Sequence, residues 1–136
     1  MRRNTKGELT GIRNSEQLKN DEKFKDLAIN VIHDSGENWS INGLSVMKRN
    51  SIARIVYYYE LYQKCINVPG VICEFGVHWG AGISTLLNLR SILEPYNSSR
   101  HIIGFDTFEG FASTHSKDGE NLQDGDYETP SGYEKI

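Results

Sequence analysis

The sequence has few cysteines and no long apolar stretch, and each absence excludes a class of protein. The two cysteines, Cys65 and Cys73, are too few for a disulfide scaffold and lack the spacing of a metal site. We expect both to be inert thiols packed in apolar segments of the core. No run of about 18 apolar residues is present, and polar residues follow Met1 where a signal peptide would need an apolar run. We therefore expect a cytoplasmic protein with no membrane partner.

The sequence also lacks a basic patch, although its charge is unevenly distributed. Residues 1–66 carry 11 lysines and arginines against 8 acidic residues, whereas residues 67–136 carry 4 against 10. The basic residues of the first half are scattered and are not interleaved with aromatic residues. The electrostatic signature of nucleic-acid binding is missing, so we expect no nucleic-acid partner.

The sequence contains 38% hydrophobic and 24% charged residues, a composition that is typical of one soluble globular domain. Residues 1–20 are polar and without periodicity, which predicts a disordered or frayed terminus. Residues 21–66 contain two helical periods, which predict an N-terminal lid of helices over 21–33 and 46–66, joined by a loop. The second period places a set of apolar residues on one face of its helix, namely Ile52, Ile55, Val56, Tyr59, Tyr62 and Ile66. The tyrosine run 57–59 is expected to pack in core and boundary positions, because consecutive helical positions point in different directions.

Residues 67–136 predict the first part of a Rossmann-like α/β domain. A short apolar run over 71–75, a glycine-rich segment, a helical period and a second apolar run over 100–106 form a βαβ unit. The first strand has the pattern of one buried on both faces of a parallel sheet. Because two strands cannot close such a sheet, the chain looks like a truncated part of a doubly wound domain. Residues 107–136 predict a long loop, whose last six residues resemble the first turn of a helix.

Chemistry is concentrated in the segment Glu74-Phe75-Gly76-Val77-His78-Trp79-Gly80-Ala81-Gly82, which leaves the first strand and opens the helix. Glycine lets the backbone turn tightly and approach a ligand, and the start of a helix offers free N–H groups. Asp106 stands at the end of the second strand, where a carboxylate can accept both ribose hydroxyls of a nucleoside. These features predict a nucleoside pocket at the carboxyl ends of the strands.

The glycine spacing distinguishes between nucleoside cofactors. It is G-x-x-x-G-x-G instead of the G-x-G-x-x-G of dinucleotide-binding proteins, which disfavours a nicotinamide cofactor. Glu74, two residues before Gly76, is typical of sites for S-adenosylmethionine, whose positive amino group and sulfonium favour a nearby carboxylate. Structural interpretations stay open, since Glu74 could cap its own turn, Asp106 could cap the following turn, and the glycines could serve only helix–strand packing.

Two segments at the predicted site carry a resemblance to a known family. They are Val68-Pro69-Gly70-Val71-Ile72-Cys73-Glu74-Phe75-Gly76-Val77-His78-Trp79-Gly80 and Phe105-Asp106-Thr107-Phe108-Glu109-Gly110. The first is similar to V-P-G-D-x-x-E-x-G-V-x-x-G, and the second to D-S-F-E-G, in the macrocin O-methyltransferase-like family of class I S-adenosylmethionine-dependent methyltransferases. Met47 is similar to a methionine of that family's N-terminal lid. The resemblance covers residues 45–111.

The resemblance implies cofactor-binding residues in both segments. The methionine end of the site would be shaped by Glu74, Gly76, Val77 and Gly80, and the ribose and adenosine edge by Asp106, Thr107 and Phe108. In the family a divalent metal such as Mg and a general base come from carboxylates on later strands, so no catalytic residue or metal ligand is assigned in this chain. Asp124-Gly125-Asp126-Tyr127 superficially resembles a later metal motif, but it follows the second strand instead of the fourth and is interpreted as a loop.

The sequence therefore predicts an S-adenosylmethionine-dependent O-methyltransferase that acts on a hydroxyl of a sugar or natural product, with this chain alone inactive. Two alternatives stay open. A dinucleotide-dependent Rossmann enzyme has the same architecture. A non-catalytic binding or assembly module, which could form homo-oligomers, would use an apolar sheet face that further strands would otherwise cover.

Overall fold

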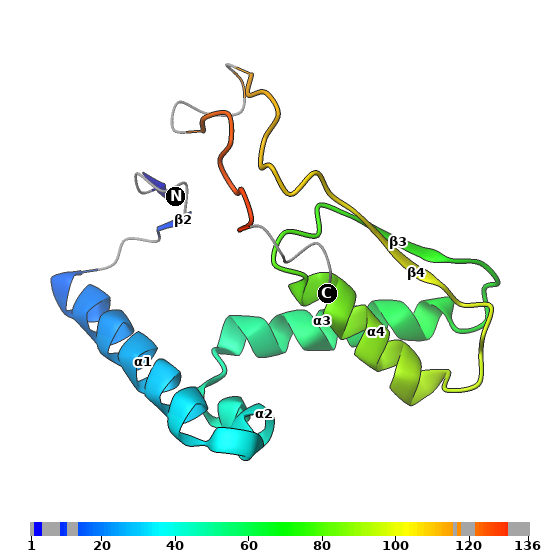
Figure 1. Cartoon of the computed structure of the whole chain (residues 1–136), viewed down its shortest axis with the longest axis horizontal. Coiled ribbons are helices and arrows are strands. Elements are labelled where there is room, and N and C mark those ends of the chain that lie inside the picture. Colours follow the sequence, from blue (N-terminus) through cyan, green and yellow to red (C-terminus); the bar gives the residue numbers. More distant parts are fainter. Residues whose placement is uncertain (1, 4–8, 11–13, 116, 118–121, 131–136) are drawn as a thin grey trace. The chain divides into compact units, whose positions relative to one another are not determined.

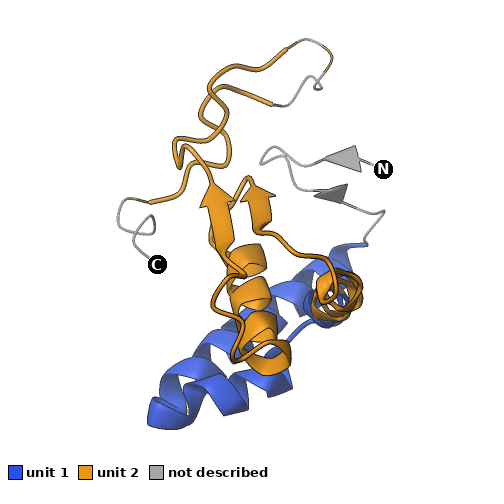
Figure 2. Cartoon of the chain, turned by 90° about the vertical axis from the view of Figure 1, so that its right-hand side faces the viewer, with its two compact units in different colours: residues 1–53 blue, residues 54–136 orange. Residues whose placement is uncertain are grey.

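A computed structural model of the chain describes residues 2–3, 9–10, 14–115, 117 and 122–130. It divides into two compact units, residues 1–53 and residues 54–136 (Figure 2). Figure 1 shows their helices and strands. In chain order these elements are β1 (Arg2–Arg3), β2 (Leu9–Thr10), α1 (Ser15–Asp34), η1 (Gly36–Asn38), α2 (Trp39–Asn42), η2 (Gly43–Val46), α3 (Arg49–Cys65), β3 (Ile72–Phe75), α4 (Ala81–Leu93) and β4 (Ile102–Phe105).

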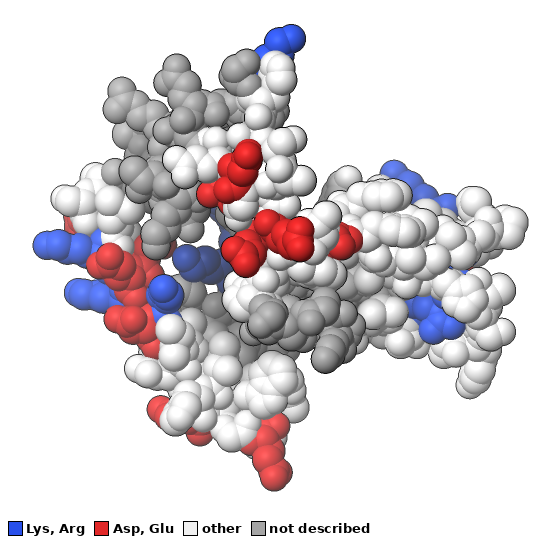
Figure 3. Space-filling model, turned by 45° about the horizontal axis from the view of Figure 1, so that its top comes forward, with Lys and Arg blue, Asp and Glu red and all other residues white. Residues whose placement is uncertain are grey.

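Helix α1 begins at Ser15, six residues before the predicted start at 21. Asn14 and Gln17 form a capping box, in which the Gln17 nitrogen donates to Asn14 Oδ1 at 2.8 Å and the Asn14 nitrogen donates to Gln17 Oε1 at 3.1 Å. Residues 15–20, predicted as part of a frayed terminus, are therefore helical. Acidic and basic side chains lie next to one another along this helix (Figure 3), as expected for a solvated helical surface.

The loop predicted after α1 is instead a series of short helical turns formed by η1, α2 and η2. Serine and asparagine side chains form local hydrogen bonds along these turns. Asn42 Nδ2 donates to Ser35 Oγ at 3.1 Å, and Ser45 Oγ donates to the Asn42 carbonyl oxygen at 2.7 Å. Residues that are typical of loops therefore support these turns through local side-chain hydrogen bonds, although none of the three turns has a side-chain cap at its N-terminus.

The second unit contains the predicted βαβ unit. Strands β3 and β4 pair in parallel, from Ile72 opposite Ile102 to Phe75 opposite Phe105, and α4 connects them. The core lies between one face of this sheet and helices α3 and α4 (Figure 1). Its buried members are Tyr62, Leu86 and Leu89, with Tyr58, Ile66, Ile72, Leu93 and Ile102 partly buried around them.

Only part of the predicted apolar face of helix α3 reaches this core. The predicted face, which included Ile52, Ile55, Val56 and Tyr59, is between 39% and 51% exposed at these positions. Tyr62 and Ile66 of that face do reach the core, together with Tyr58 from the tyrosine run. The prediction for the run is therefore correct for Tyr58, whereas Tyr57 and Tyr59 are exposed.

The opposite face of the sheet is exposed, contrary to the prediction of a strand buried on both faces. Along β3, Ile72 and Glu74 point toward the helices, whereas Cys73 is exposed and Phe75 is 79% exposed. The Phe75 and Phe105 rings stack on this outer face with centroids 5.0 Å apart. The expectation of two core thiols is wrong for Cys73, because the described residues supply no second layer for that face.

A buried ion pair closes the end of the sheet at which the strands begin. Arg100, which is 4% exposed, donates to Glu94 Oε2 at 3.0 Å, and the Tyr62 hydroxyl donates to the same oxygen at 2.6 Å. The guanidinium also donates to four carbonyl oxygens at the end of α3 and in the turn after it, those of Cys65, Ile66, Val68 and Gly70. Arg100 therefore serves as the C-terminal cap of α3.

The described residues after β4, namely 106–115, 117 and 122–130, contain no helix or strand, and hydrogen bonds join residues 108–114 to residues 124–129. Phe111 and Asp126 are joined through the Phe111 nitrogen and the Asp126 carbonyl oxygen at 3.0 Å, and the Thr129 nitrogen donates to the Phe108 carbonyl oxygen at 3.1 Å. Asp124 Oδ1 accepts from the backbone nitrogen of Thr114 at 2.7 Å. This agrees with a loop role for the Asp124–Tyr127 segment. The helical turn predicted at 131–136 lies outside the described residues.

Candidate functional site

The site begins at the turn between β3 and α4. The nitrogen of Gly76 donates to the Phe105 carbonyl oxygen at 2.9 Å, so the ladder between the strands continues one residue beyond β3. Gly76 and Gly80 have φ values of +84° and +79°, in the left-handed region that glycine adopts without a steric penalty. Gly80 is the N-cap of α4. The glycines at these two positions therefore set the path of the chain from strand to helix.

Asp106 ties this turn to the end of β4. Its Oδ2 accepts from the backbone nitrogen of His78 at 2.7 Å, and its Oδ1 accepts from the nitrogen of Phe108 at 2.7 Å. These backbone N–H groups lower the pKa of the Asp106 carboxyl, against the opposing effect of burial. The carboxylate therefore caps the following turn, which is the structural role left open for it above. It also fixes the glycine turn through the His78 nitrogen. A carboxylate has about four lone-pair sites, so ribose hydroxyls could still bind to the remaining ones.

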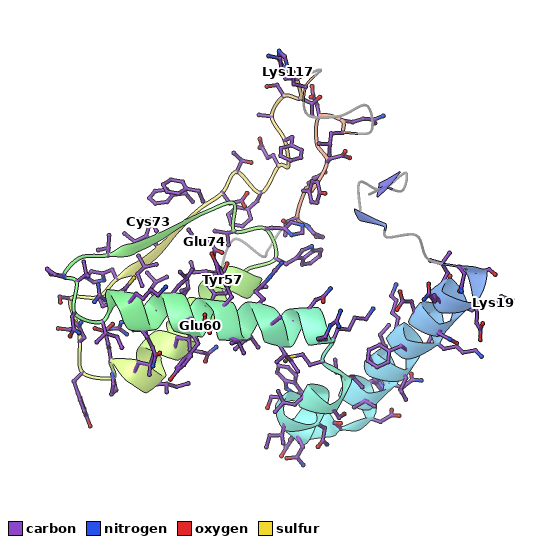
Figure 4. All side chains as sticks on the ribbon, turned by 180° about the vertical axis from the view of Figure 1, so that it is seen from behind. Lys19, Tyr57, Glu60, Cys73, Glu74 and Lys117 are labelled. Carbon is purple, nitrogen blue, oxygen red and sulfur yellow. The ribbon has the colours of Figure 1, made fainter. Side chains whose placement is uncertain are left out.

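Glu74 points from β3 toward α3, and one of its oxygens lacks a partner. The Tyr58 hydroxyl lies 3.4 Å from Glu74 Oε1. Oε2 is buried and accepts no hydrogen bond within the described part of the chain. Figure 4 shows Glu74 and Tyr57 in the space where β3 and α3 face one another. The interpretation of Glu74 as a cap of its own turn finds no hydrogen bond to support it among the described residues.

Gly82 lets the first turn of α4 pass close to the ends of the Glu74 and Tyr58 side chains. A Cβ at this position would lie 2.8 Å from Glu74 Cδ and 2.9 Å from the Tyr58 hydroxyl oxygen. A side chain at position 82 would therefore displace the Glu74 carboxyl or the Tyr58 hydroxyl. The packing interpretation of the glycines is correct for Gly82. It does not account for Gly76, where a Cβ would meet no atom within 4 Å.

These elements enclose a pocket of about 350 Å³ at the carboxyl end of β3. This volume is within the range of sites for small molecules. The pocket is lined by Arg54, Tyr57, Tyr58, Glu74, Gly76, Val77, His78, Trp79, Ala81 and Gly82. Sequence reasoning missed the three residues on α3, because a helical period does not show which side of a helix faces a strand. The adjacent tyrosines were the available signal.

The predicted cofactor residues are only partly brought together. Three of the seven line the pocket, namely Glu74, Gly76 and Val77. Gly80 is buried in the turn, and Asp106 is joined to the pocket through His78. Thr107 and Phe108 lie in the following turn, where Thr107 Oγ1 donates to the Gly110 carbonyl oxygen at 3.3 Å. They do not line this pocket.

Aromatic rings from two loops meet beside the glycine turn. The ring centroid of His78 lies 5.8 Å from that of Trp79 and 5.9 Å from that of Tyr127, both in edge-on arrangements. The Phe111 ring lies 5.4 Å from Tyr127. The loop after β4 therefore contacts the glycine turn, and Tyr127 serves in this packing.

No group of three or more histidine, cysteine, aspartate or glutamate residues that could hold a metal ion occurs within the described ranges. None of the helices described is both long and apolar enough to cross a membrane.

Comparison with known proteins identifies solved structures that share this fold. No protein-family model and no curated protein matches the chain significantly. A crystal structure of CalS11, a calicheamicin methyltransferase, superimposes with a TM-score of 0.78 and 28% identity, covering 94% of this chain and 54% of that one. An apo structure of CalS11, described as a TDP-rhamnose 3'-O-methyltransferase in calicheamicin biosynthesis, gives a TM-score of 0.65 and 28% identity, covering 92% and 45%.

This chain therefore spans about half the length of the structures it matches. The likeness supports a methyltransferase family in general. It does not single out the macrocin O-methyltransferase-like family that the motifs resemble. The mixed fold with its small parallel sheet matches part of a methyltransferase structure.

Proposed function

We propose that this chain binds S-adenosylmethionine and serves an O-methyltransferase that acts on a hydroxyl of a sugar. The observation that carries this proposal is the match to CalS11 over 94% of the chain at 28% identity, since it pairs the fold with a methyltransferase. The acceptor class is proposed by analogy, because CalS11 is described as acting on TDP-rhamnose. The macrocin O-methyltransferase-like motifs favour the same class of acceptor.

The pocket fits the proposed cofactor in two respects. Glu74 Oε2 is buried without a hydrogen-bond partner among the described residues, and leaving such an oxygen unsatisfied costs about 1–3 kcal/mol. A ligand ammonium group would satisfy it. The space beside Gly76, where a Cβ would meet no atom within 4 Å, leaves the backbone of the turn open to a ligand. Both residues belong to the segment that the resemblance assigns to the methionine end of the site.

In the proposed reaction, the residues of this chain bind the cofactor and position it. When bound, S-adenosylmethionine supplies a methyl group activated by the sulfonium. Glu74 holds a positive group of the ligand, and Asp106 keeps the turn in shape through the His78 nitrogen. Fixing a reactant in the correct geometry accounts for a large share of the acceleration in such transfers. The described residues are assigned no general base and no metal, so deprotonation of the acceptor hydroxyl is not assigned to this chain.

Calorimetric titration of the chain with S-adenosylhomocysteine tests the proposal. We expect binding that Glu74→Gln weakens about tenfold, because a neutral amide replaces the carboxylate next to an ammonium group. Glu60→Gln is the matched control, since Glu60 is an exposed residue of α3 outside the pocket. Its affinity should equal that of the unmodified chain.

Titration with NAD separates the dinucleotide alternative. Binding of NAD in preference to S-adenosylhomocysteine would favour a dinucleotide-dependent enzyme. A chain that circular dichroism shows to be folded and that binds neither compound would contradict the proposal and favour the non-catalytic module.

A further inference from the structure

The pocket presents two opposite charges from two different elements. Glu74 comes from β3 and Arg54 from α3, and both line the same space at the carboxyl end of the strand. Tyr57 and Tyr58 of α3 line it as well. A site with one carboxylate and one guanidinium is electrostatically complementary to a ligand that carries both an ammonium and a carboxylate group.

Neither charge is neutralised by a protein partner in the described part of the chain. Arg54 is exposed and makes no hydrogen bond or ion pair there, whereas Glu74 has a buried oxygen without a partner. Both act on the hydroxyl of Tyr58. Burial raises the pKa of Tyr58, Glu74 raises it further, and Arg54 lowers it. The two charges are therefore within electrostatic reach of one hydroxyl inside the pocket.

We propose that Arg54 binds the carboxylate of an α-amino-acid group in the ligand, while Glu74 binds its ammonium, so that the pocket recognises a zwitterion. This inference rests on the proposed function, because it assigns a second anchor for the methionine end of the cofactor. Arginine suits this role, since its planar fork of N–H donors matches a carboxylate in a bidentate arrangement. A phosphate is a poorer occupant, because it would lie in the same pocket as the Glu74 carboxylate and be repelled by it.

The position of Arg54 explains why the sequence motif alone does not contain it. The motif covers the strand and the turn, whereas Arg54 is 20 residues before Glu74 and on a separate helix. The parallel strand and α3 meet only after folding. The residue that completes the zwitterion site is therefore supplied by the helix that covers the sheet.

Two ligands that differ in the amino-acid group test this assignment. S-adenosylhomocysteine contains the zwitterion, and 5'-methylthioadenosine has the same nucleoside and thioether without it. We expect Arg54→Gln to weaken S-adenosylhomocysteine binding about tenfold and to leave 5'-methylthioadenosine binding unchanged. Arg54→Lys should restore part of the lost affinity, because it keeps the charge without the fork. Arg49→Gln is the matched control, since Arg49 is in the same helix and does not line the pocket.

The outcomes separate this inference from the proposed function. Equal weakening of both ligands, or no effect on either, would overturn the role of Arg54 while leaving cofactor binding intact. Failure of the unmodified chain to bind S-adenosylhomocysteine would overturn the proposed function and, with it, the zwitterion site. Retained binding of 5'-methylthioadenosine by Arg54→Gln also shows that the variant is folded.

Discussion

The Asp106 carboxylate accepts a 2.7 Å hydrogen bond from the backbone nitrogen of His78, 28 residues earlier in the chain. His78 has a φ of +51°, a left-handed conformation that costs a non-glycine residue about 1 kcal/mol or more. The bond therefore holds the turn after β3 in a conformation that its own sequence disfavours. It joins the two motifs of the candidate site through one side chain.

Asp106→Asn should weaken this connection without changing the size of the side chain. An amide offers one acceptor oxygen where the carboxylate offers two, so either the His78 or the Phe108 nitrogen loses its acceptor. We expect the free energy of unfolding to fall by about 1–2 kcal/mol in urea titrations, together with weaker S-adenosylhomocysteine binding. Glu109→Gln, three residues later and exposed, is the control. Equal stability of Asp106→Asn and Glu109→Gln would show that the bond to His78 is dispensable.

Gly82→Ala should disturb the site through a steric effect. The added Cβ would lie 2.8 Å from Glu74 Cδ, so either the carboxyl or the start of α4 must move. We expect a clear loss of S-adenosylhomocysteine affinity with only a small change in stability, because the displaced atoms are the ends of the flexible Glu74 and Tyr58 side chains. Gly43→Ala is a matched control, because its Cβ would meet only Ile32 at an ordinary 3.8 Å. Wild-type affinity in Gly82→Ala would show that the position of Glu74 does not matter for the ligand.

The Glu94 ion pair should make the folded chain sensitive to acid. Hydrogen bonds from Arg100, then from Tyr62 and Asn97, lower the pKa of Glu94 to about 2 from an ordinary value of 4.5. The unfolded chain therefore takes up the proton at higher pH than the folded chain. The stabilisation by Glu94 is present above pH 4.5 and is lost as the pH falls toward 2.

Thermal unfolding of Glu94→Gln across this pH window measures the contribution. We expect the Tm of the variant to be lower at neutral pH by about 5 °C or more, because the buried Arg100 loses its counter-charge. The difference in Tm between the variant and the unmodified chain should shrink as the pH falls, since both then lack the charge. The pKa of Asp106 is also lowered, but this residue is present in both proteins. Its contribution to the pH dependence of Tm therefore cancels in the difference. A difference that is constant from neutral to acid pH would contradict the assignment.

Local signals in the sequence were sufficient for the βαβ unit and for the turn of the site. The apolar runs that became β3 and β4 are short and bounded by turn residues, and the glycines at 76 and 80 are in the left-handed conformations that such a turn requires. The capping box of Asn14 and Gln17 is also a local signal. The predicted helix start at residue 21 did not take it into account and is six residues later than the observed start of α1. These features depend on neighbours within a few positions, which the sequence displays directly.

Only the tertiary structure decided which side chains meet across those elements. The pocket includes Arg54 and Tyr58 because α3 packs beside β3, and the phase of a helix against a strand is set by the whole interface. Arg100 can be buried because carbonyl oxygens more than 30 residues earlier in the chain accept hydrogen bonds from its guanidinium, and no local sequence pattern indicates this environment. Phe75 is exposed because burial of a strand face depends on a second layer of structure. A sequence determines the conformations that its residues prefer, whereas burial and charge pairing depend on contacts between distant segments.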